Sequence, residues 1–485
     1  MPKMIAALIL VFGLIVTTEA ARAEKDKGVC GFPTSRQGSH CVLEQDVVLT
    51  ETLVLASHTR LNCKGHSISP VATGKGSTAT THVASTPEVA IVLQSAEDVE
   101  IENCRIGGGF DFGITIFAST GAKIKGNEIH TRMQGITLIE SDDNRISENE
   151  IRWSSGGGVG ISILRNSDRN RISGNTLVSP VRPLEFAPET PGTRAPATCA
   201  DCGVRVVNPL SPVINLVVGG KLSQVPDSPE STNDDNVIEE NVVNMARRGI
   251  STGIRSRSSV IRGNRVSGGG SGIAATDDNK DQDFRLPGRC SLDRSRYCAT
   301  SEDCNIPGVD GSGRGTCSGV QNAVADLVSV DVAIENNTLL GPFDVNAIIL
   351  GATRNAVARG NVVTGGATMG IQLAEYALET ATVTGNRIEG AATGIHLGPV
   401  CAARFFGARV SLNDIVGSTL RAITAAQEYA FPSELSVDGR GNYWGHTCSE
   451  GGFVPGDSST TLIFDSHPYG TPVAGTSGRK PPPCS

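Results

Sequence analysis

FGITIFASTGAKIKGNEI (residues 112–129) contains the patterns that decide the fold. An alternating apolar run comes first, a short polar turn follows, and Asn stands two residues before the last apolar position. The segment returns as QGITLIESDDNRISENEI (residues 134–151) and as VGISILRNSDRNRISGNTL (residues 159–177), and weaker copies recur about every 22–27 residues up to residue 442. A fixed period of this size is typical of stacked-repeat proteins.

The apolar residues within each copy alternate, as Ile114 with Ile116 and Ile136 with Leu138 do. A period of two predicts strands rather than helices, and the Gly, Asn, Ser and Asp between the runs predict turns. No strand alternates with a helical pattern, which excludes the α/β folds. Three short strands per copy, coiled so that each pairs with its equivalent in the next copy, make an all-β parallel β-helix, a solenoid of about 10–12 coils.

One asparagine recurs at a fixed place in the copies. Asparagine tolerates the left-handed backbone region, and stacked side-chain amides can bond one another along a column. We therefore interpret these residues as a structural ladder at a corner, without a catalytic role. The column consists of Asn103, Asn127, Asn149, Asn175, Asn241, Asn264, Asn337, Asn361 and Asn386.

The two ends of the repeat region carry a family resemblance. CVLEQDVVLTETLVLASHTRLNCKGHSISP (Cys41–Pro70) resembles the first coils of secreted members of the right-handed, single-stranded parallel β-helix superfamily, and GNYWG (Gly441–Gly445) resembles the end of NosD-type periplasmic proteins. The resemblance implies the fold. It leaves function open, because the superfamily includes pectin and alginate enzymes, phage tailspikes, adhesins and accessory proteins.

The N-terminus has the pattern of an export signal. Lys3 precedes an apolar run that is too short to span a bilayer, and Ala21-Arg22-Ala23 is a small-x-small cleavage site. We therefore expect a secreted or periplasmic protein, cleaved after Ala23, without a transmembrane segment. The expected organisation is a signal peptide (1–23), an N-terminal cap (24–50), the β-helix (51–445) with insertions at about 179–231 and 277–321, and a tail (446–485).

Charge and cysteine content agree with that location. The net charge of −8, without a basic run, argues against a nucleic-acid partner. Thirteen cysteines fit an oxidising compartment. Cys63 and Cys104 occupy matching places and are interpreted as small inward-facing apolar groups. The disulfide candidates, with pairing open within the Cys-rich second insertion, are Cys30 with Cys41, Cys199 with Cys202, Cys448 with Cys484, and Cys290, Cys298, Cys304 and Cys317.

Outward positions of the Gly-Ile strands predict a candidate ligand-binding face. Its hydroxyl stripe is Thr115, Thr137 and Ser162, and its apolar stripe is Phe117, Ile139 and Leu164; by the same alignment the first stripe continues through Ile348, Gln372 and His396, and the second through Leu350 and Ala374. Either the first insertion folds over this face, or the face meets a ligand or partner.

Two further clusters could carry chemistry. Glu140, Asp142, Asp143 and Arg165 follow this strand in adjacent coils and are either a catalytic carboxylate group or a surface ion pair with solvated turn residues. The alternating oxygen donors of Asp277, Asn279, Asp281 and Asp283 form either a calcium loop or a solvated acidic loop.

Two functions remain open from the sequence. The first is a non-catalytic binding protein, a surface or periplasmic scaffold whose partner is a polysaccharide or a protein. The second is a carbohydrate-active enzyme, either a lyase, a hydrolase or an epimerase. The chain lacks the Asn-Thr-Asp, RxPxxR and Asp-Pro-His-Asp motifs of the enzymes on this fold, and this favours the scaffold.

Overall fold

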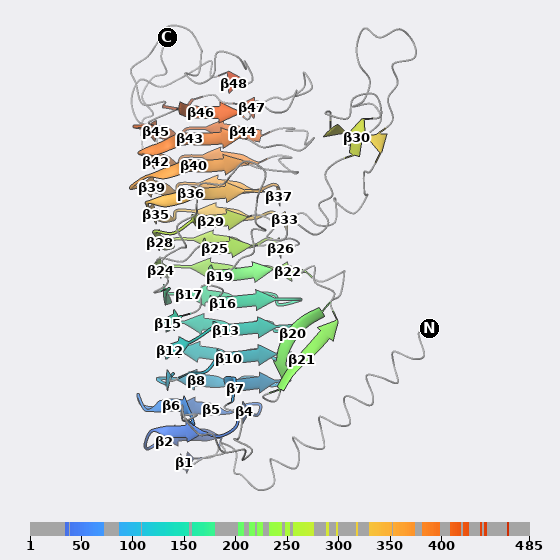
Figure 1. Ribbon diagram of the computed structural model, residues 1–485, viewed down its shortest axis with the longest axis vertical. Helices are drawn as coiled ribbons and strands as arrows, with labels where there is room; N and C mark the ends of the chain where they lie inside the picture. Colours follow the sequence, from blue (N-terminus) through green and yellow to red (C-terminus); the bar gives the residue numbers. More distant parts are fainter. Residues whose placement is uncertain are drawn as a thin grey trace, which may run out of the picture.

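Figure 1 shows the computed structural model of the chain, in which short strands stack along one axis. The structure describes residues 39–71, 87–107, 109–154, 158–179, 232–244, 248–252, 256–275, 329–351, 353–373, 381–397, 408–418, 421–425 and 441–443, and the backbone of the strands at 34–37, 202–207, 213–218, 221–226, 288–290, 297–298, 317–318, 437–438 and 463–464. Strands, turns and bends make up these residues, and none of them is helical.

Three long sheets form the walls of the solenoid, and apart from the antiparallel pair β1–β2 their strands are parallel. Sheet A consists, in spatial order, of β1 (Thr34–Gln37), β2 (His40–Leu43), β5 (Arg60–Asn62), β8 (Glu100–Glu102), β11 (Lys123–Lys125), β14 (Arg145–Ser147), β17 (Arg171–Ser173), β23 (Val237–Glu239), β27 (Val260–Arg262), β34 (Ala333–Glu335), β38 (Val357–Arg359), β41 (Thr382–Thr384), β44 (Ala408–Ser411), β47 (Val437–Asp438) and β48 (Ile463–Phe464).

Sheet B consists of β3 (Val47–Leu49), β6 (Ser67–Pro70), β9 (Arg105–Ile106), β12 (Glu128–Thr131), β15 (Glu150–Trp153), β18 (Thr176–Val178), β24 (Val242–Asn244), β28 (Arg265–Ser267), β35 (Thr338–Leu340), β39 (Val362–Thr364), β42 (Arg387–Glu389) and β45 (Asp414–Val416). Sheet C consists of β4 (Leu53–Leu55), β7 (Val89–Gln94), β10 (Phe112–Phe117), β13 (Gln134–Ile139), β16 (Val159–Leu164), β19 (Cys202–Val207), β25 (Arg248–Thr252), β29 (Ser271–Ala275), β36 (Phe343–Leu350), β40 (Ala367–Leu373), β43 (Ala391–Leu397) and β46 (Arg421–Ala425).

The alternating residues stack in register, which confirms the predicted parallel β-helix. Ile114 pairs with Ile136, and Ile116 pairs with Leu138 in the next coil. These side chains belong to one continuous buried core that runs from coil to coil. Because each coil packs on its neighbours, the core grows with the number of coils and not with the width of the molecule.

The glycine of the Gly-Ile refrain allows close approach between sheets. A Cβ at Gly135 would lie 2.3 Å from Ile151 Cγ2 and 2.6 Å from the carbonyl oxygen of Gly160. Core side chains of sheet B therefore fill the space beside sheet C. This close contact explains why glycine recurs before the first isoleucine of the strand.

The predicted asparagine ladder is present at the corner between sheets A and B. In each step the Nδ2 of one asparagine donates to the Oδ1 of the next at 2.9–3.0 Å. The ladder consists of Asn127, Asn149, Asn175, Asn241, Asn264, Asn337, Asn361, Asn386, Asn413 and Asn442. Asn413 and Asn442 extend it beyond the predicted column.

The start of the ladder differs from the prediction. Asn103 is exposed, with φ of 56°, and it occupies the turn position that Gly126 takes in the next coil. Cys104 takes the ladder position instead, and its N–H donates to Asn127 Oδ1 at 2.9 Å. Cys63 and Cys104 face the core as expected, but they are joined in a disulfide that was not predicted from the sequence. A covalent link between coils thus stands where the first ladder amide would be.

The predicted first insertion contains both a coil strand and a hairpin. β19 pairs with β16 and β25, so part of the segment 179–231 completes a coil of sheet C. The antiparallel hairpin β20 (Val213–Val218) and β21 (Lys221–Pro226) leaves the stack, and β20 lies against β7 (Figure 1). In the second insertion, β30 (Gly288–Cys290), β31 (Tyr297–Cys298) and β32 (Cys317–Ser318) form a small antiparallel sheet that sets Cys290 opposite Cys317.

Candidate functional site

The predicted ligand-binding face is on the outside of sheet C, and most of it is buried. Thr115, Thr137 and Ser162 are in register with one another, and each exposes 5% or less of its surface. Ile139 is 2% exposed, whereas Phe117 and Leu164 are half-buried. In this structure the stripe therefore offers little open surface to a ligand.

The neighbouring residues on this outer face are apolar as well. Val89 and Val92 of β7 form a buried cluster with the half-buried Phe112, separate from the inner core. β20 of the first insertion lies against β7, the strand that carries both valines. Thr137 satisfies its hydroxyl on the same face by donating to Gln134 Oε1 at 2.6 Å.

The predicted continuation of the stripes needs a correction. β36 carries extra residues before its isoleucines, so Ile349 pairs with Ala274 and Gln372 in the outward column. Ile348 and Leu350 instead face the core and are fully buried. Ala374 lies outside the described residues. The irregular register within β36 shifted the sequence alignment by one position.

The predicted charged cluster comes together at the corner after sheet C. Arg165 is 5% exposed and pairs with Glu140 in the preceding coil at 3.4 Å. Arg169 contacts Asp142 at 3.3 Å and Asp143 at 2.9 Å. The hydrogen bond from Arg169 lowers the pKa of the Asp143 carboxyl below its ordinary value. Asp143 is therefore a stable carboxylate.

Two aspartates that the sequence did not single out continue this corner. Asp142 Oδ1 accepts the N–H of Asp168 at 2.9 Å, and Asp168 Oδ1 accepts the N–H of Asp234 at 2.7 Å. Burial raises the pKa of both Asp168 and Asp234. Asp234 belongs to a four-stranded corner sheet that consists of β22 (Asn233–Asp234), β26 (Ser256–Arg257), β33 (Ser329–Val330) and β37 (Thr353–Arg354). The carboxylates thus serve as acceptors that join consecutive coils.

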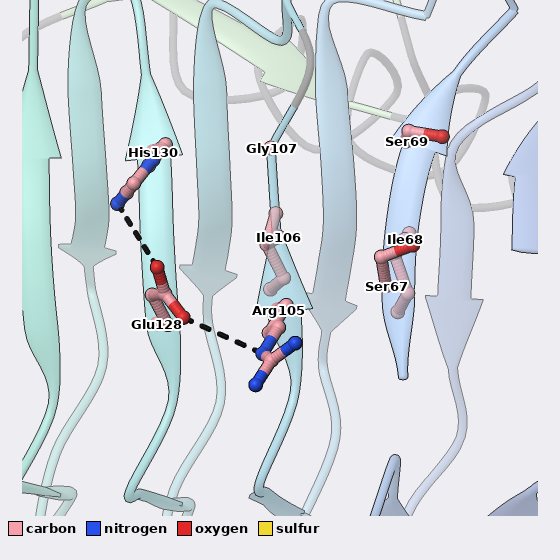
Figure 2. A pocket seen from close by; sticks show the side chains of 8 residues that line it. All are labelled: Ser67, Ile68, Ser69, Arg105, Ile106, Gly107, Glu128 and His130. Atoms are coloured by element: carbon pink, nitrogen blue, oxygen red, sulfur yellow. Dashed lines mark ion pairs between the residues drawn. The ribbon is translucent and has the colours of Figure 1, made fainter. Parts of the chain in front are cut away.

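A hollow on the outer face of sheet B was not predicted. It has a volume of about 190 Å³ and is lined by residues of β6, β9 and β12. Glu128 stands between two basic groups, with Oε2 at 3.5 Å from Arg105 Nε and Oε1 at 3.4 Å from His130 Nε2 (Figure 2). Ser67, Ser69, Gly107 and the isoleucines Ile68 and Ile106 complete the lining. About half of each charged side chain or more is exposed.

The remaining predicted site residues lie outside the described part of the chain. These are the calcium candidates Asp277, Asn279, Asp281 and Asp283, and the signal-peptide residues. Cys41 is disulfide-bonded, and Cys30 lies outside the described residues. Where the chain is described, no three His, Cys, Asp or Glu side chains gather as metal ligands, and no helix is long and apolar enough to span a membrane.

One family model matches part of the chain. Residues 48–190 match the family described as "Periplasmic copper-binding protein (NosD)". None of the curated proteins compared with the chain matches it significantly.

Similar solved structures cover most of the chain at low identity. The catalytic unit of a GH87 α-1,3-glucanase from Streptomyces thermodiastaticus has a TM-score of 0.50 and 13% identity over 90% of this chain and 70% of that chain. PfbA, a surface adhesin of Streptococcus pneumoniae, has a TM-score of 0.47 and 11% identity over 80% of this chain and 84% of that chain. The tailspike of E. coli bacteriophage HK620 has a TM-score of 0.44 and 12% identity over 79% of this chain and 58% of that chain. The registered parallel coils give the chain a parallel β-helix fold, and the family match covers residues 48–190 of it.

Proposed function

We propose that this protein is an exported, non-catalytic scaffold that binds a glycan or a cell-surface or periplasmic partner on the outside of its β-helix. Export is supported by the N-terminal signal pattern, by the Cys63–Cys104 disulfide and by the match to a family described as periplasmic. Disulfides of this kind persist in oxidising compartments.

The main observation in favour of a non-catalytic protein is that the carboxylates of the charged corner are already paired within the protein. Glu140 pairs with Arg165, Asp143 pairs with Arg169, and Asp142 accepts a backbone N–H from the next coil. A hydrolytic pair needs one carboxyl group that is free to give up a proton and another that is free to attack or to activate water. The candidates Glu140, Asp142 and Asp143 instead hold adjacent coils together.

A carbohydrate-active enzyme is the second candidate, and one observation favours it. Asp168 and Asp234 lie in adjacent coils, and burial raises the pKa of both. A carboxyl group with a raised pKa can serve as a general acid. Asp168 also accepts the N–H of Asp234 in the next coil, and Asp234 accepts the hydroxyl of Thr232, so both carboxyl groups have structural partners, which supports the scaffold as the first choice.

A polymer screen separates the two functions. Purified protein is incubated with neutral glycans and with uronic-acid polymers, with and without calcium, and reducing ends and unsaturated products are measured. The scaffold predicts no product above that of a heat-treated sample. Product release that is lost in Asp168→Asn or Glu140→Ala, while both variants keep the wild-type circular dichroism spectrum, would overturn it.

A further inference from the structure

The hollow on sheet B exists because one position of an outward column has no side chain. Gly107 follows Ile106, which is in register with Ile68 and Ile129 of the adjacent coils. A Cβ at Gly107 would lie 3.6 Å from His130 Cβ, an ordinary contact distance. The backbone therefore does not require glycine at this place. A side chain at this position would project toward His130 and take up space in the hollow.

The three charged groups of the hollow keep their hydrogen-bonding capacity. Arg105 and His130 contact Glu128 as ion pairs, but no hydrogen bond joins these side chains to another described residue. The next coil is different, because Arg152 Nε donates to Glu150 Oε1 at 2.8 Å. Glu150 is in register with Glu128. Glu150 thus accepts a side-chain hydrogen bond from its arginine, whereas the equivalent Glu128 has only ion-pair contacts.

The order of donors and acceptors across the hollow selects a ligand. From Arg105 through Glu128 to His130 the groups are an N–H donor, two carboxylate oxygens and, with a proton on Nε2, a second N–H donor (Figure 2). A hydroxyl group is both a donor and an acceptor. Two hydroxyls on neighbouring carbons can therefore each donate to one oxygen of Glu128, while one accepts from Arg105 and the other from His130.

We propose that this hollow binds one sugar ring of a neutral glycan through a vicinal diol, a proposal that rests on the binding role proposed above. Its volume of about 190 Å³ corresponds to roughly six water molecules, which is enough for one ring. Ser67 and Ser69 add hydroxyls at the rim. Glu128 lies at the centre and disfavours an anionic sugar, because like charges repel at short range.

The test measures binding of the full mature chain to gluco-, manno- and galacto-oligosaccharides, with oligogalacturonate and oligoalginate as anionic probes. Saturation-transfer NMR or isothermal titration gives the affinity. We expect a neutral probe to bind, and Gly107→Val and Glu128→Gln each to weaken it about tenfold or more, because a charged hydrogen-bonding group is lost or its space is filled. Periodate oxidation of the probe, which cleaves vicinal diols, should abolish binding.

The matched control is Glu150→Gln, one coil away on the same face, where we expect less than a twofold change. Thermal unfolding verifies that the variants are folded. If Gly107→Val does not fold, Glu128→Gln still tests the proposal, because Glu128 is exposed and its replacement should not disturb folding. The proposal is overturned if no neutral probe binds, if the hollow variants bind like wild type, or if Glu150→Gln weakens binding as much as Glu128→Gln. Failure of the scaffold function is a separate result, namely product release in the polymer screen.

Discussion

Removing one amide from the asparagine ladder should destabilise the solenoid strongly. Asn175 is fully buried. Its Oδ1 accepts from the N–H and the Nδ2 of Asn149 at 3.0 and 2.9 Å, and its Nδ2 donates to Ile146 O and Asn241 Oδ1, both at 2.9 Å. Asn175→Ala removes the partner of the Asn149 N–H and of Ile146 O, whereas Asn241 Oδ1 keeps the N–H of residue 175 and Asn149 Nδ2 keeps Ile124 O. At about 1–3 kcal/mol for each of these two buried groups, with partial relaxation, we expect a loss of about 2–5 kcal/mol.

Asn103 provides the control because the sequence pattern alone would place it in the same column. It is exposed at a turn with φ of 56°, where glycine stands in the next coil, so Asn103→Gly should change stability by about 0.5 kcal/mol or less. Denaturant unfolding measures both variants. Repeat proteins can unfold in parts, so hydrogen exchange at the Asn149 amide gives the local effect. Equal losses in Asn175→Ala and Asn103→Gly would refute the ladder reasoning.

Three further perturbations test other parts of the structure. Replacing Cys63 and Cys104 together with serine should cost about 4 kcal/mol, because the disulfide spans 41 residues. The difference should disappear in urea unfolding when both proteins are reduced, because reduction also breaks the disulfide of Cys41 in both. Burial lowers the pKa of His396, so the unfolded chain takes up the proton first and the folded state loses stability as the pH falls below 6.5. His396→Gln should reduce that loss by at most about 1.4 kcal/mol per pH unit, which melting curves at pH 7 and pH 5 measure. Gly135→Ala should lower stability by about 1–3 kcal/mol through overpacking, whereas Gly107→Ala should leave the melting temperature nearly unchanged. A larger loss of stability in Gly107→Ala than in Gly135→Ala would contradict the close approach of sheets B and C.

The periodic features of the fold could be predicted because they are repeated in every coil. Alternating isoleucines identified the strands, and the asparagine period identified the corner that joins them. The error at Asn103 arose because a turn residue and a ladder residue are adjacent and either can be asparagine. Cys104 could be placed only from the register of Ile106 with Ile129. A second ladder, in which Ser119, Ser141 and Ser167 hydroxyls accept backbone N–H groups, was missed because serine also occurs in ordinary turns.

The outer surface was harder to predict because it depends on what lies against each sheet. Thr115 and Thr137 alternate with core residues in a way that is also expected of an open face, yet both are buried. The repeat pattern does not encode where an interruption such as the hairpin β20–β21 folds back. The hollow at Gly107 was missed for a related reason: the first coil has irregular spacing, and its register with Ser69 follows only from the paired strands.

The same stacking explains why we propose a ligand site on the outside of sheet B. Core isoleucines, corner amides and most of the charged corner already have partners in the next coil, and changing them would break the stack. Outward side chains of short strands are the positions that a coil can vary without losing its neighbours. Within the described part of sheet B, Arg105, Glu128 and His130 combine an open hollow with unused hydrogen-bonding capacity. A ligand there would use groups whose only contacts with one another are the exposed ion pairs of Glu128.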